Sequence, residues 1–331
     1  MTPRPFRTVL TASACFCAVA CGQTLDAGAT RPHGLLPVDE RNPVVLMNDG
    51  WSDNWAGEYA VLLANGGGPK LAGIVVNAAG TWSDLDENVT GWRALVAAAR
   101  ESGLSGIPDP IASISDKLVR PASGVIEDTL PNRSEGALFI LRVSSELSRP
   151  YRPLVVATGG RLTDVADAYL IEPALAERIV VVSSLGELSQ SGAAMGVPNG
   201  EMDPWADAIV SARLRYVQVN AYYDQLTEVP ASRLGELPSN ALGAFIAAKQ
   251  PQVYDLDVAA DQVAVLAAGF PAFVTAVARV SGDGSVSPGA TEGPELTASR
   301  EGPAWLVTEG ASALAVGHFW ELLLDRRTYA R

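Results

Sequence analysis

Short apolar runs, each followed by a helix-length segment, most constrain what this chain can fold into. Each run has the length of one strand and little polar alternation, as expected when helices cover both faces of a sheet. The runs are Val44–Met47, Leu71–Val76, Pro153–Ala157, Ile179–Val182 and Tyr216–Val219. Because strands that alternate with helices pair in parallel through right-handed crossovers, we expect an α/β fold with a mostly parallel sheet and helices on both faces.

The span from residue 43 to residue 331 reads as a single domain, because it contains neither an internal repeat nor a linker-like composition. Residues 103–132 lack periodicity and are expected to form extended segments and surface loops. Residues 281–293 are rich in Gly and polar residues and predict a hairpin or a loop.

Residues 1–20 predict a secretory signal peptide, since Arg4 and Arg7 precede the short apolar run Val9–Ala20 without any acidic residue. The run is too short to span a membrane. Its end, Ala18-Val19-Ala20-Cys21-Gly22, resembles the lipobox of bacterial lipoproteins. That resemblance implies a lipidated Cys21, and the alternative is an ordinary cleavage site with a chance cysteine.

The cysteines lie only at positions 15, 17 and 21, so the mature chain has no disulfide and no Cys metal site. Residues 21–42 are polar, contain Pro32 and Pro37, and predict a flexible tether. By the same resemblance, Gly22 stands where an Asp would retain a lipoprotein in the inner membrane. We therefore expect an exported, lipid-anchored protein of the bacterial cell envelope, on the periplasmic side of the outer membrane, with the leaflet left open.

The formal net charge of −13 argues against a nucleic-acid partner, which would require a basic face. A metal cation or an uncharged small molecule suits this charge better. The anchor is then the only expected contact with a membrane, and the sequence leaves the oligomeric state open, a homo-oligomer included.

Polar residues cluster where the first apolar run ends. Asn48, Asp49, Asp53 and Asn54 follow it within seven residues, and the polar turn Thr158–Gly160 follows a later run in the same way. In an open α/β sheet, ligands bind at the carboxyl ends of strands, beside helix N-termini. The pattern predicts a polar crevice suited to a cation or a polyol, while the alternative is that Asp53 or Asn54 merely caps the next helix.

Four segments, in this order, resemble motifs of the inosine-uridine preferring nucleoside hydrolase family. Met47–Asn54 corresponds to its hallmark Asp-x-Asp-Pro-Gly-x-Asp-Asp. Val156–Ala166, continued by Glu172–Val182, is similar to its Ala-Thr-Gly-Pro-Leu-Thr-Asn segment with the following Asp-Pro-Glu helix and strand. Asn199–Ala206 matches Asn-x-x-x-Asp-Pro-x-Ala, and Ala260–Val265 matches His-Asp-x-x-Ala-Val. The similarity extends from Pro43 to Val280 and implies a nucleoside hydrolase-like fold with a Rossmann-like core.

The resemblance implies hydrolysis of the N-glycosidic bond of a ribonucleoside or a related N-ribosyl compound. It also implies a calcium ion, which prefers hard oxygen ligands such as carboxylates, amides and carbonyls. The implied metal ligands are Asp49, Asn54, Asp261 and the carbonyl of Thr158. Asp53 and Asn199 would hydrogen-bond the sugar hydroxyls. Asp49 would act as general base for a calcium-activated water that attacks C1 of the ribose.

The chain departs from the family pattern at three positions. Met47 replaces the first acid, Asn54 replaces a metal-binding acid and Ala260 replaces the His before the last acid. Fewer charges are expected to weaken the calcium site. The histidines, His33 and His318, are expected to be solvated or packed.

The Asn that the family carries after the second strand corresponds to Asn77 or to Thr81, and the sequence leaves this choice open. Three functions remain. The first is an exported nucleoside hydrolase, and the second is a lipoprotein that binds a nucleoside or a sugar in the same pocket without turning it over. The third is an unrelated periplasmic solute-binding protein, which would need two lobes joined by a hinge.

Overall fold

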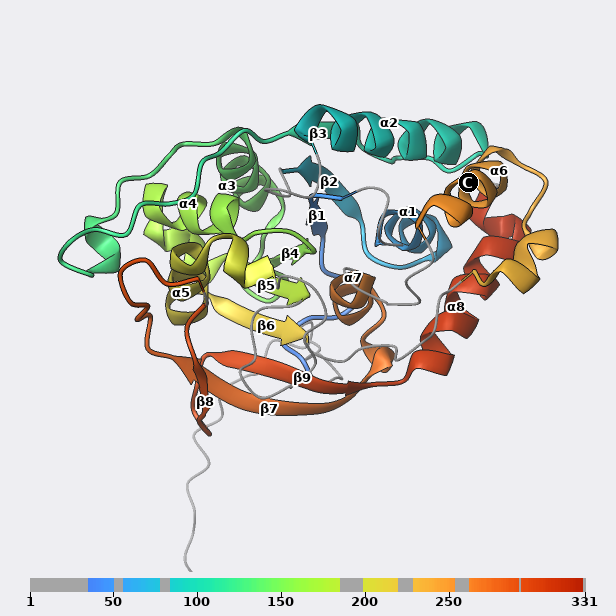
Figure 1. The fold of residues 1–331 in the computed structure, drawn as a ribbon. Coiled ribbons are helices and arrows are strands. Elements are labelled where there is room, and N and C mark those ends of the chain that lie inside the picture. Colours follow the sequence, from blue (N-terminus) through green and yellow to red (C-terminus); the bar gives the residue numbers. More distant parts are fainter. Residues whose placement is uncertain are drawn as a thin grey trace, which may run out of the picture. The chain divides into compact units, whose positions relative to one another are not determined.

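A long β-sheet runs through the middle of the fold (Figure 1). The computed structural model describes residues 35–50, 56–77, 84–184, 199–219, 229–253, 262–291 and 293–329. Within these residues the strand order is β3-β2-β1-β4-β5-β6-β9-β7-β8. The strands are β1 (Val44–Asn48), β2 (Leu71–Val76), β3 (Pro110–Ala112), β4 (Leu154–Thr158), β5 (Ile179–Ser184), β6 (Arg215–Val219), β7 (Val274–Gly282), β8 (Leu296–Ala298) and β9 (Ala304–Gly310).

The sheet is parallel from β3 through β6 to β9, and only β7 and β8 run antiparallel to their neighbours. The expected mostly parallel sheet is therefore confirmed. Successive residues of β1 alternate between two separate hydrophobic cores, with Val44 and Leu46 in one and Val45 and Met47 in the other. Both faces of the sheet are thus buried, which explains why its central strands lack polar alternation.

Helices cover both faces of the sheet, and the described elements belong to one compact unit (Figure 1). One face is covered by α1 (Ala56–Gly66), α2 (Leu85–Glu101), α6 (Ala241–Val253), α7 (Gln262–Gly269) and α8 (Ser312–Leu324). The other face is covered by α3 (Glu135–Leu147), α4 (Thr163–Ile171) and α5 (Pro204–Arg213). None of the helices in the described ranges combines the length and the apolar composition that a membrane span requires.

Two short strands were not expected from the sequence. β3 lies in the stretch predicted as loops, and β8 follows the Gly-rich segment. Each has three residues, which is too few for a periodic pattern to show. By contrast β2 has the predicted bounds. The residue types Asp203 and Pro204 are typical of a helix start, and α5 indeed begins with Pro204 at its first position and with Asp203 Oδ1 accepting from Ala206 N at 3.2 Å.

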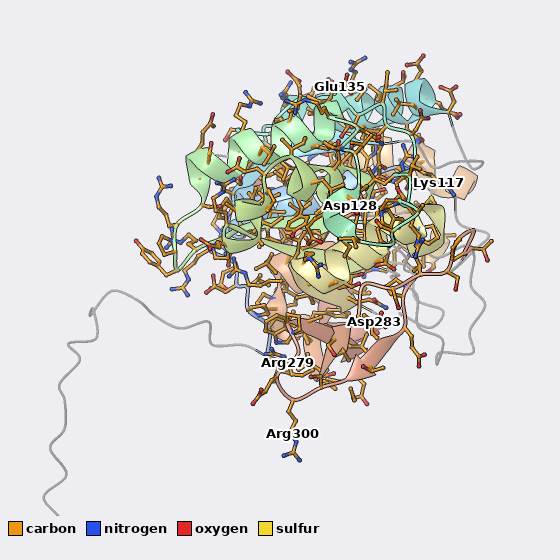
Figure 2. The ribbon with its side chains drawn as sticks, turned by 90° about the vertical axis from the view of Figure 1, so that its left-hand side faces the viewer. Lys117, Asp128, Glu135, Arg279, Asp283 and Arg300 are labelled. Atoms are coloured by element: carbon orange, nitrogen blue, oxygen red, sulfur yellow. The ribbon has the colours of Figure 1, made fainter. Side chains whose placement is uncertain are left out.

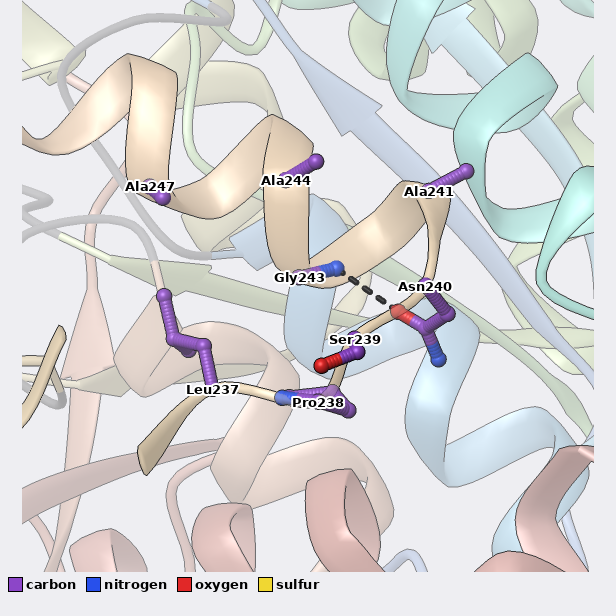
Figure 3. A pocket seen from close by; sticks show the side chains of 8 residues that line it. All are labelled: Leu237, Pro238, Ser239, Asn240, Ala241, Gly243, Ala244 and Ala247. Atoms are coloured by element: carbon purple, nitrogen blue, oxygen red, sulfur yellow. Dashed lines mark hydrogen bonds between the residues drawn. The ribbon is translucent and has the colours of Figure 1, made fainter. Parts of the chain in front are cut away.

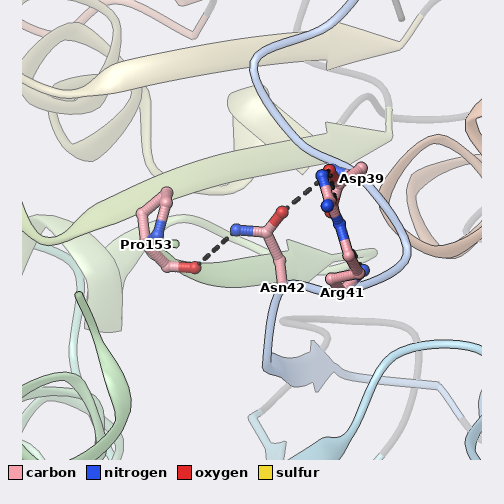
Figure 4. A network of polar contacts seen from close by, with 4 residues as sticks. All are labelled: Asp39, Arg41, Asn42 and Pro153. Atoms are coloured by element: carbon pink, nitrogen blue, oxygen red, sulfur yellow. Dashed lines mark hydrogen bonds and ion pairs between the residues drawn. The ribbon is translucent and has the colours of Figure 1, made fainter. Parts of the chain in front are cut away.

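The last residues of the predicted tether pack against the domain. Leu36 and Val38 are buried in the core beside α1. Asn42 donates from Nδ2 to the carbonyl oxygen of Pro153 at 2.7 Å and accepts from Asp39 N at 2.9 Å (Figure 4). Since Pro153 directly precedes β4, this amide joins the start of β1 to the start of its neighbour.

Charged side chains of both signs are interspersed over the outside of the fold (Figure 2). Lys117, Asp128 and Glu135 lie on the side of α3, and Asp283 and Arg300 lie toward the end that carries β7. All five are exposed. Ion pairs between exposed charges contribute little to the free energy of folding. Among the described residues one ion pair differs, because both of its side chains are fully buried.

That buried pair joins α1 to α6. Lys249 Nζ lies 2.6 Å from Glu58 Oε1, and the two side chains are 2% and 1% exposed. Removing two charges from water costs several kcal/mol each, and their attraction offsets this cost only while both remain in place. The pair therefore constrains where α6 packs, because any other arrangement would leave a lone charge in the core.

We predict that Glu58→Gln lowers the free energy of unfolding by about 3–5 kcal/mol, because it removes the carboxylate charge that lies against the buried Lys249 ammonium. Urea denaturation measures this loss. A double variant, Glu58→Leu with Lys249→Met, should recover most of it.

The matched control is Glu127→Gln, which breaks the exposed pair between Arg213 Nε and Glu127 Oε1 at 2.8 Å. Its expected cost is below about 1 kcal/mol. A Glu58→Gln loss no larger than the Glu127→Gln loss would show that the buried pair is not a structural constraint.

Candidate functional site

The candidate site lies at the carboxyl ends of β1 and β4, where the helices that follow neighbouring strands switch from one face of the sheet to the other. β1 is followed by α1 on one face, whereas its neighbour β4 is followed by α4 on the opposite face. The connections from the two strands therefore diverge and leave a crevice beyond their carboxyl ends, which is the usual ligand site in open α/β sheets. Met47 pairs with Thr158, and Gly159 N donates to Met47 O at 3.0 Å, so the two strand ends lie side by side.

Asp49 follows the last residue of β1 at this switch point. It is only 5% exposed. The backbone N–H of Gly50 donates to Asp49 Oδ1 at 2.6 Å, which fixes the orientation of the carboxylate. A buried, oriented carboxylate at a strand end is suited to accept a proton or to bind a cation.

The Thr158–Gly160 turn faces Asp49. Thr158 Oγ1 accepts from Gly160 N at 3.2 Å and donates to Gly160 O at 3.0 Å, so the side chain closes the turn on itself. A Cβ atom on Gly160 would lie 2.7 Å from Asn77 Oδ1 and 3.2 Å from Asp49 N. Only glycine lets this turn come so close to the end of β1.

Asn77 completes the group, while Thr81, the other position that the sequence left open, lies outside the described residues. Its N–H donates to Asn48 O at 3.0 Å, and its Nδ2 donates to Arg161 O at 3.3 Å. Asn77 is fully buried, and its Oδ1 has no hydrogen-bond partner among the described residues. A buried amide oxygen without a donor is costly, which makes it a good acceptor for a ligand hydroxyl. The sequence feature that indicates Asn77 is its position directly after β2.

Asn199 lies at the same edge of the sheet, beside the end of β5. Its Nδ2 donates to Ser184 O at 3.1 Å, and the residue is 6% exposed. The structure thus places three of the predicted residues, Asp49, Thr158 and Asn199, at adjacent strand ends. Asp53, Asn54, Asp261 and Cys21 lie outside the described residues.

Two further buried carboxylates, Asp203 and Asp164, are hydrogen-bonded near the start of α4, just after the turn in the chain. Asp203 Oδ2 accepts from Thr163 Oγ1 at 2.7 Å and from Leu118 N at 2.9 Å, and Asp164 Oδ1 accepts from Ser113 Oγ at 2.7 Å. Burial raises the pKa of both carboxyls above the ordinary value, while the positive charge of Arg161 opposes this shift. Ser113 and Arg161 could not be identified from the sequence, because their partners come from segments far apart in the chain.

His318 is packed, as expected. Its ring stacks on Phe270 with centroids 3.9 Å apart, and its Nδ1 lies 2.5 Å from the hydroxyl of Tyr59. Burial lowers the pKa of His318, so the ring is neutral at pH 7.

The described part of the site fits a calcium ion in its donor chemistry. The Asp49 carboxylate, the Thr158 carbonyl and the unpartnered Asn77 Oδ1 are all hard oxygen donors at the same switch point. The described residues contain no group of three or more His, Cys, Asp or Glu side chains close enough to hold a metal. Any calcium site here would therefore need the other two predicted ligands, Asn54 and Asp261.

We predict that Gly160→Ala destabilises the fold by about 1–3 kcal/mol, because the added methyl overlaps Asn77 Oδ1 and crowds the backbone of Asp49. Thermal or urea unfolding measures the loss. Gly317→Ala, at a helical position with open space around the new methyl, is the control and should be neutral or gain about 0.5–1 kcal/mol. Equal effects of the two changes would mean that the turn does not approach Asp49 closely.

We also predict that Asp164→Asn gains stability relative to the wild type as the pH rises above 3.8. The unfolded carboxyl ionises freely there, whereas the buried native carboxyl, with its raised pKa, resists ionisation, so the contribution of Asp164 to the stability of the wild type falls with rising pH. Urea midpoints of both proteins between pH 3.5 and 7 test this. Asp116→Asn, on an exposed loop, is the control, and a constant difference across this range for Asp164→Asn would contradict the assignment.

Comparison with known proteins identifies the fold. No family model and no curated protein matches the sequence. Among solved structures, the chain is similar to the inosine-uridine preferring nucleoside hydrolase from Bacillus anthracis, with a TM-score of 0.60, 14% identity and coverage of 87% of this chain and 100% of that one.

Two other solved structures are similar to a comparable degree. The plant nucleoside hydrolase PpNRh1 has a TM-score of 0.58, 16% identity and coverage of 86% of this chain and 100% of that one. An inosine-guanosine nucleoside hydrolase has a TM-score of 0.60, 16% identity and coverage of 85% and 98%. At such low identity the likeness establishes the architecture alone: the chain has a nucleoside hydrolase-like α/β fold.

Proposed function

We propose that the protein hydrolyses the N-glycosidic bond of a ribonucleoside or a related N-ribosyl compound. One observation carries this proposal: a buried, oriented carboxylate, Asp49, lies at the switch point between β1 and β4, against the turn that begins at Thr158. The three similar solved structures described above, each named a nucleoside hydrolase, support it through their shared fold.

In this proposal Asp49 is the general base. Its carboxylate accepts the proton of a water molecule as that water attacks C1 of the ribose, and the hydrogen bond from Gly50 N holds it in orientation. The bond to the base breaks through an oxocarbenium-like state, in which positive charge develops on the sugar while the electron pair of the bond goes to the base, which takes up a proton from solvent. The negative charge that Asp49 carries until it accepts the proton of the water stabilises that state more than it would in water.

Amide side chains position the sugar. Asn77 Oδ1 accepts a hydrogen bond from a ribose hydroxyl and thereby gains the partner that it lacks within the described residues. Asn199, held at the end of β5 by Ser184, contributes a second polar contact from the neighbouring strand. Asp53 is proposed as a further contact to the sugar from the segment that follows Asp49.

We propose that calcium is the metal of this site and that Asp49, the Thr158 carbonyl, Asn54 and Asp261 hold it. When bound, calcium lowers the pKa of a coordinated water and offers coordination positions to sugar hydroxyls. Since Asn54 contributes an amide and not a carboxylate, the affinity should be lower than that of a site with a further charge. An exported location would favour loading, because calcium can be abundant outside the cytoplasm.

A second function is favoured by one specific observation. Met47 occupies the position of the first acid in the family motif, and its side chain is fully buried in the core that α3, α4 and α5 cover. That position therefore contributes no charge to the crevice. A protein that binds a nucleoside or a sugar without turning it over is the alternative.

Export and lipidation remain proposals from the sequence. The signal peptide of residues 1–20 and Cys21 lie outside the described residues. The proposed location is the periplasmic side of the outer membrane, with the protein attached through the lipid at Cys21.

We predict that protein lacking residues 1–21 releases free base from at least one member of a ribonucleoside panel in calcium buffer. Asp49→Asn should lower the rate by about 10²–10⁴-fold, as expected for loss of a general base. Chromatography of the released base measures the activity. Asp116→Asn, at an exposed loop position, is the control and should retain full activity.

The outcomes separate the two functions and test the metal. No release from any nucleoside, together with calorimetric binding that Asp49→Asn weakens, would replace the hydrolase with the binding protein. Chelation should lower the melting temperature of the wild type and abolish release, because a ligand that binds only the native state stabilises it. If chelation alters neither property, the metal assignment is wrong.

A further inference from the structure

Two hollows lie away from the candidate site. The larger, of 440 Å³, lies along the first turns of α6, and its lining residues are all uncharged (Figure 3). The side-chain oxygen of Asn240 in its wall already accepts from Gly243 N at 2.8 Å, as a helix cap. This hollow therefore has no charge with which to select a ligand.

The second hollow has a volume of 310 Å³ and a distinct chemistry. It lies where α1 ends at Gly66 and α7 ends at Gly269, with Glu40 and His318 in its wall. Glu40 precedes β1, whereas Asp49 follows it, so this cavity lies at the opposite end of the strand from the candidate site. The wall of this cavity contains none of the residues of the candidate site.

Two helix C-termini meet at this cavity. The last carbonyls of a helix have no partner inside the helix, and they carry the negative end of its dipole. At α1 the Leu63 carbonyl accepts from Gly68 N at 2.9 Å, and at α7 the Leu266 carbonyl accepts from Phe270 N at 2.7 Å. The terminal carbonyls beyond these two still favour a positively charged group nearby.

Glu40 adds a full negative charge. Its carboxylate makes no hydrogen bond and no ion pair with any described residue. The neighbouring Arg41 binds Asp39 through its guanidinium and is attracted to Glu40 only through space. Among the residues described, the cavity wall contains neither lysine nor arginine. The negative potential of the cavity is therefore not neutralised by its own wall.

The remaining wall is apolar and aromatic. Phe270 and His318 stack at 3.9 Å, and Leu63 and Leu322 contribute aliphatic surface. His318 Nδ1 is engaged by the Tyr59 hydroxyl at 2.5 Å, and a neutral imidazole does not repel a cation. Aromatic rings also attract ammonium groups electrostatically.

We propose that this cavity binds an alkylammonium group, with the nitrogen against Glu40 and the two helix C-termini and the carbon chain against Phe270 and Leu322. A free amine and the lysine side chain of another protein share this chemistry. The proposal does not depend on the proposed hydrolase activity, because it uses none of the residues of that site.

The test is calorimetric titration of the full chain at constant ionic strength, with n-butylammonium as the probe and 1-butanol as its neutral counterpart. We expect n-butylammonium to bind at least ten times more tightly than 1-butanol. Glu40→Gln should weaken the binding of n-butylammonium at least fivefold and leave the binding of 1-butanol unchanged. Glu101→Gln, an exposed change at the end of α2, should alter neither.

Two further probes distinguish the sources of the amine. Tighter binding of putrescine supports a free polyamine, whereas tighter binding of Nα-acetyl-lysine methylamide supports a lysine side chain. Equal affinity for n-butylammonium and 1-butanol would overturn the proposal, and so would an unchanged affinity in Glu40→Gln. Because Glu40 is exposed, its replacement should not disturb folding, and an unchanged melting temperature confirms this.

Discussion

The position of β1 between two parallel neighbours determines most of what this fold can do. β1 pairs with β2 on one side and with β4 on the other, and the helices that follow β1 and β4 lie on opposite faces. The segments that leave β1 and β4 therefore turn away from each other, and they leave the carboxyl ends of the two strands uncovered. A crevice is therefore a consequence of the topology, and the polar residues placed there by the sequence meet at its base.

The five strands β1, β2, β4, β5 and β6 were predictable from the sequence, because burial on both faces leaves uninterrupted apolar runs, whereas their order in the sheet was not. Leu71–Val76 is a strand with the predicted bounds, and Asp203 with Pro204 marks the start of α5. β3 and β8 were missed because three residues carry no periodicity. Residues 35–42 look like a linker in composition, yet Leu36 and Val38 pack into the core, which only the tertiary structure reveals.

The candidate site was predictable only in part. Asp49 and Thr158 follow from their places at strand ends, and parallel pairing brings those ends together. The position of Asn77 depends on the hydrogen bond between Asn77 N and Asn48 O, which no local pattern shows, and Thr81 lies outside the described residues. The layer beneath, with Asp164 bound by Ser113 and Asp203 bound by Leu118, depends on contacts across long sequence separations that no local pattern encodes.

The short strands at the two margins of the sheet have a consequence for self-association. β3 and β8 have three residues each, and β3 begins with a proline, which lacks an N–H. β3 and β8 themselves therefore offer little free backbone on which another polypeptide could add a strand. Since β8 pairs only with Val280–Gly282, the part of β7 before Val280 has no described strand on that side, and strand addition by a second copy would have to use this part of β7.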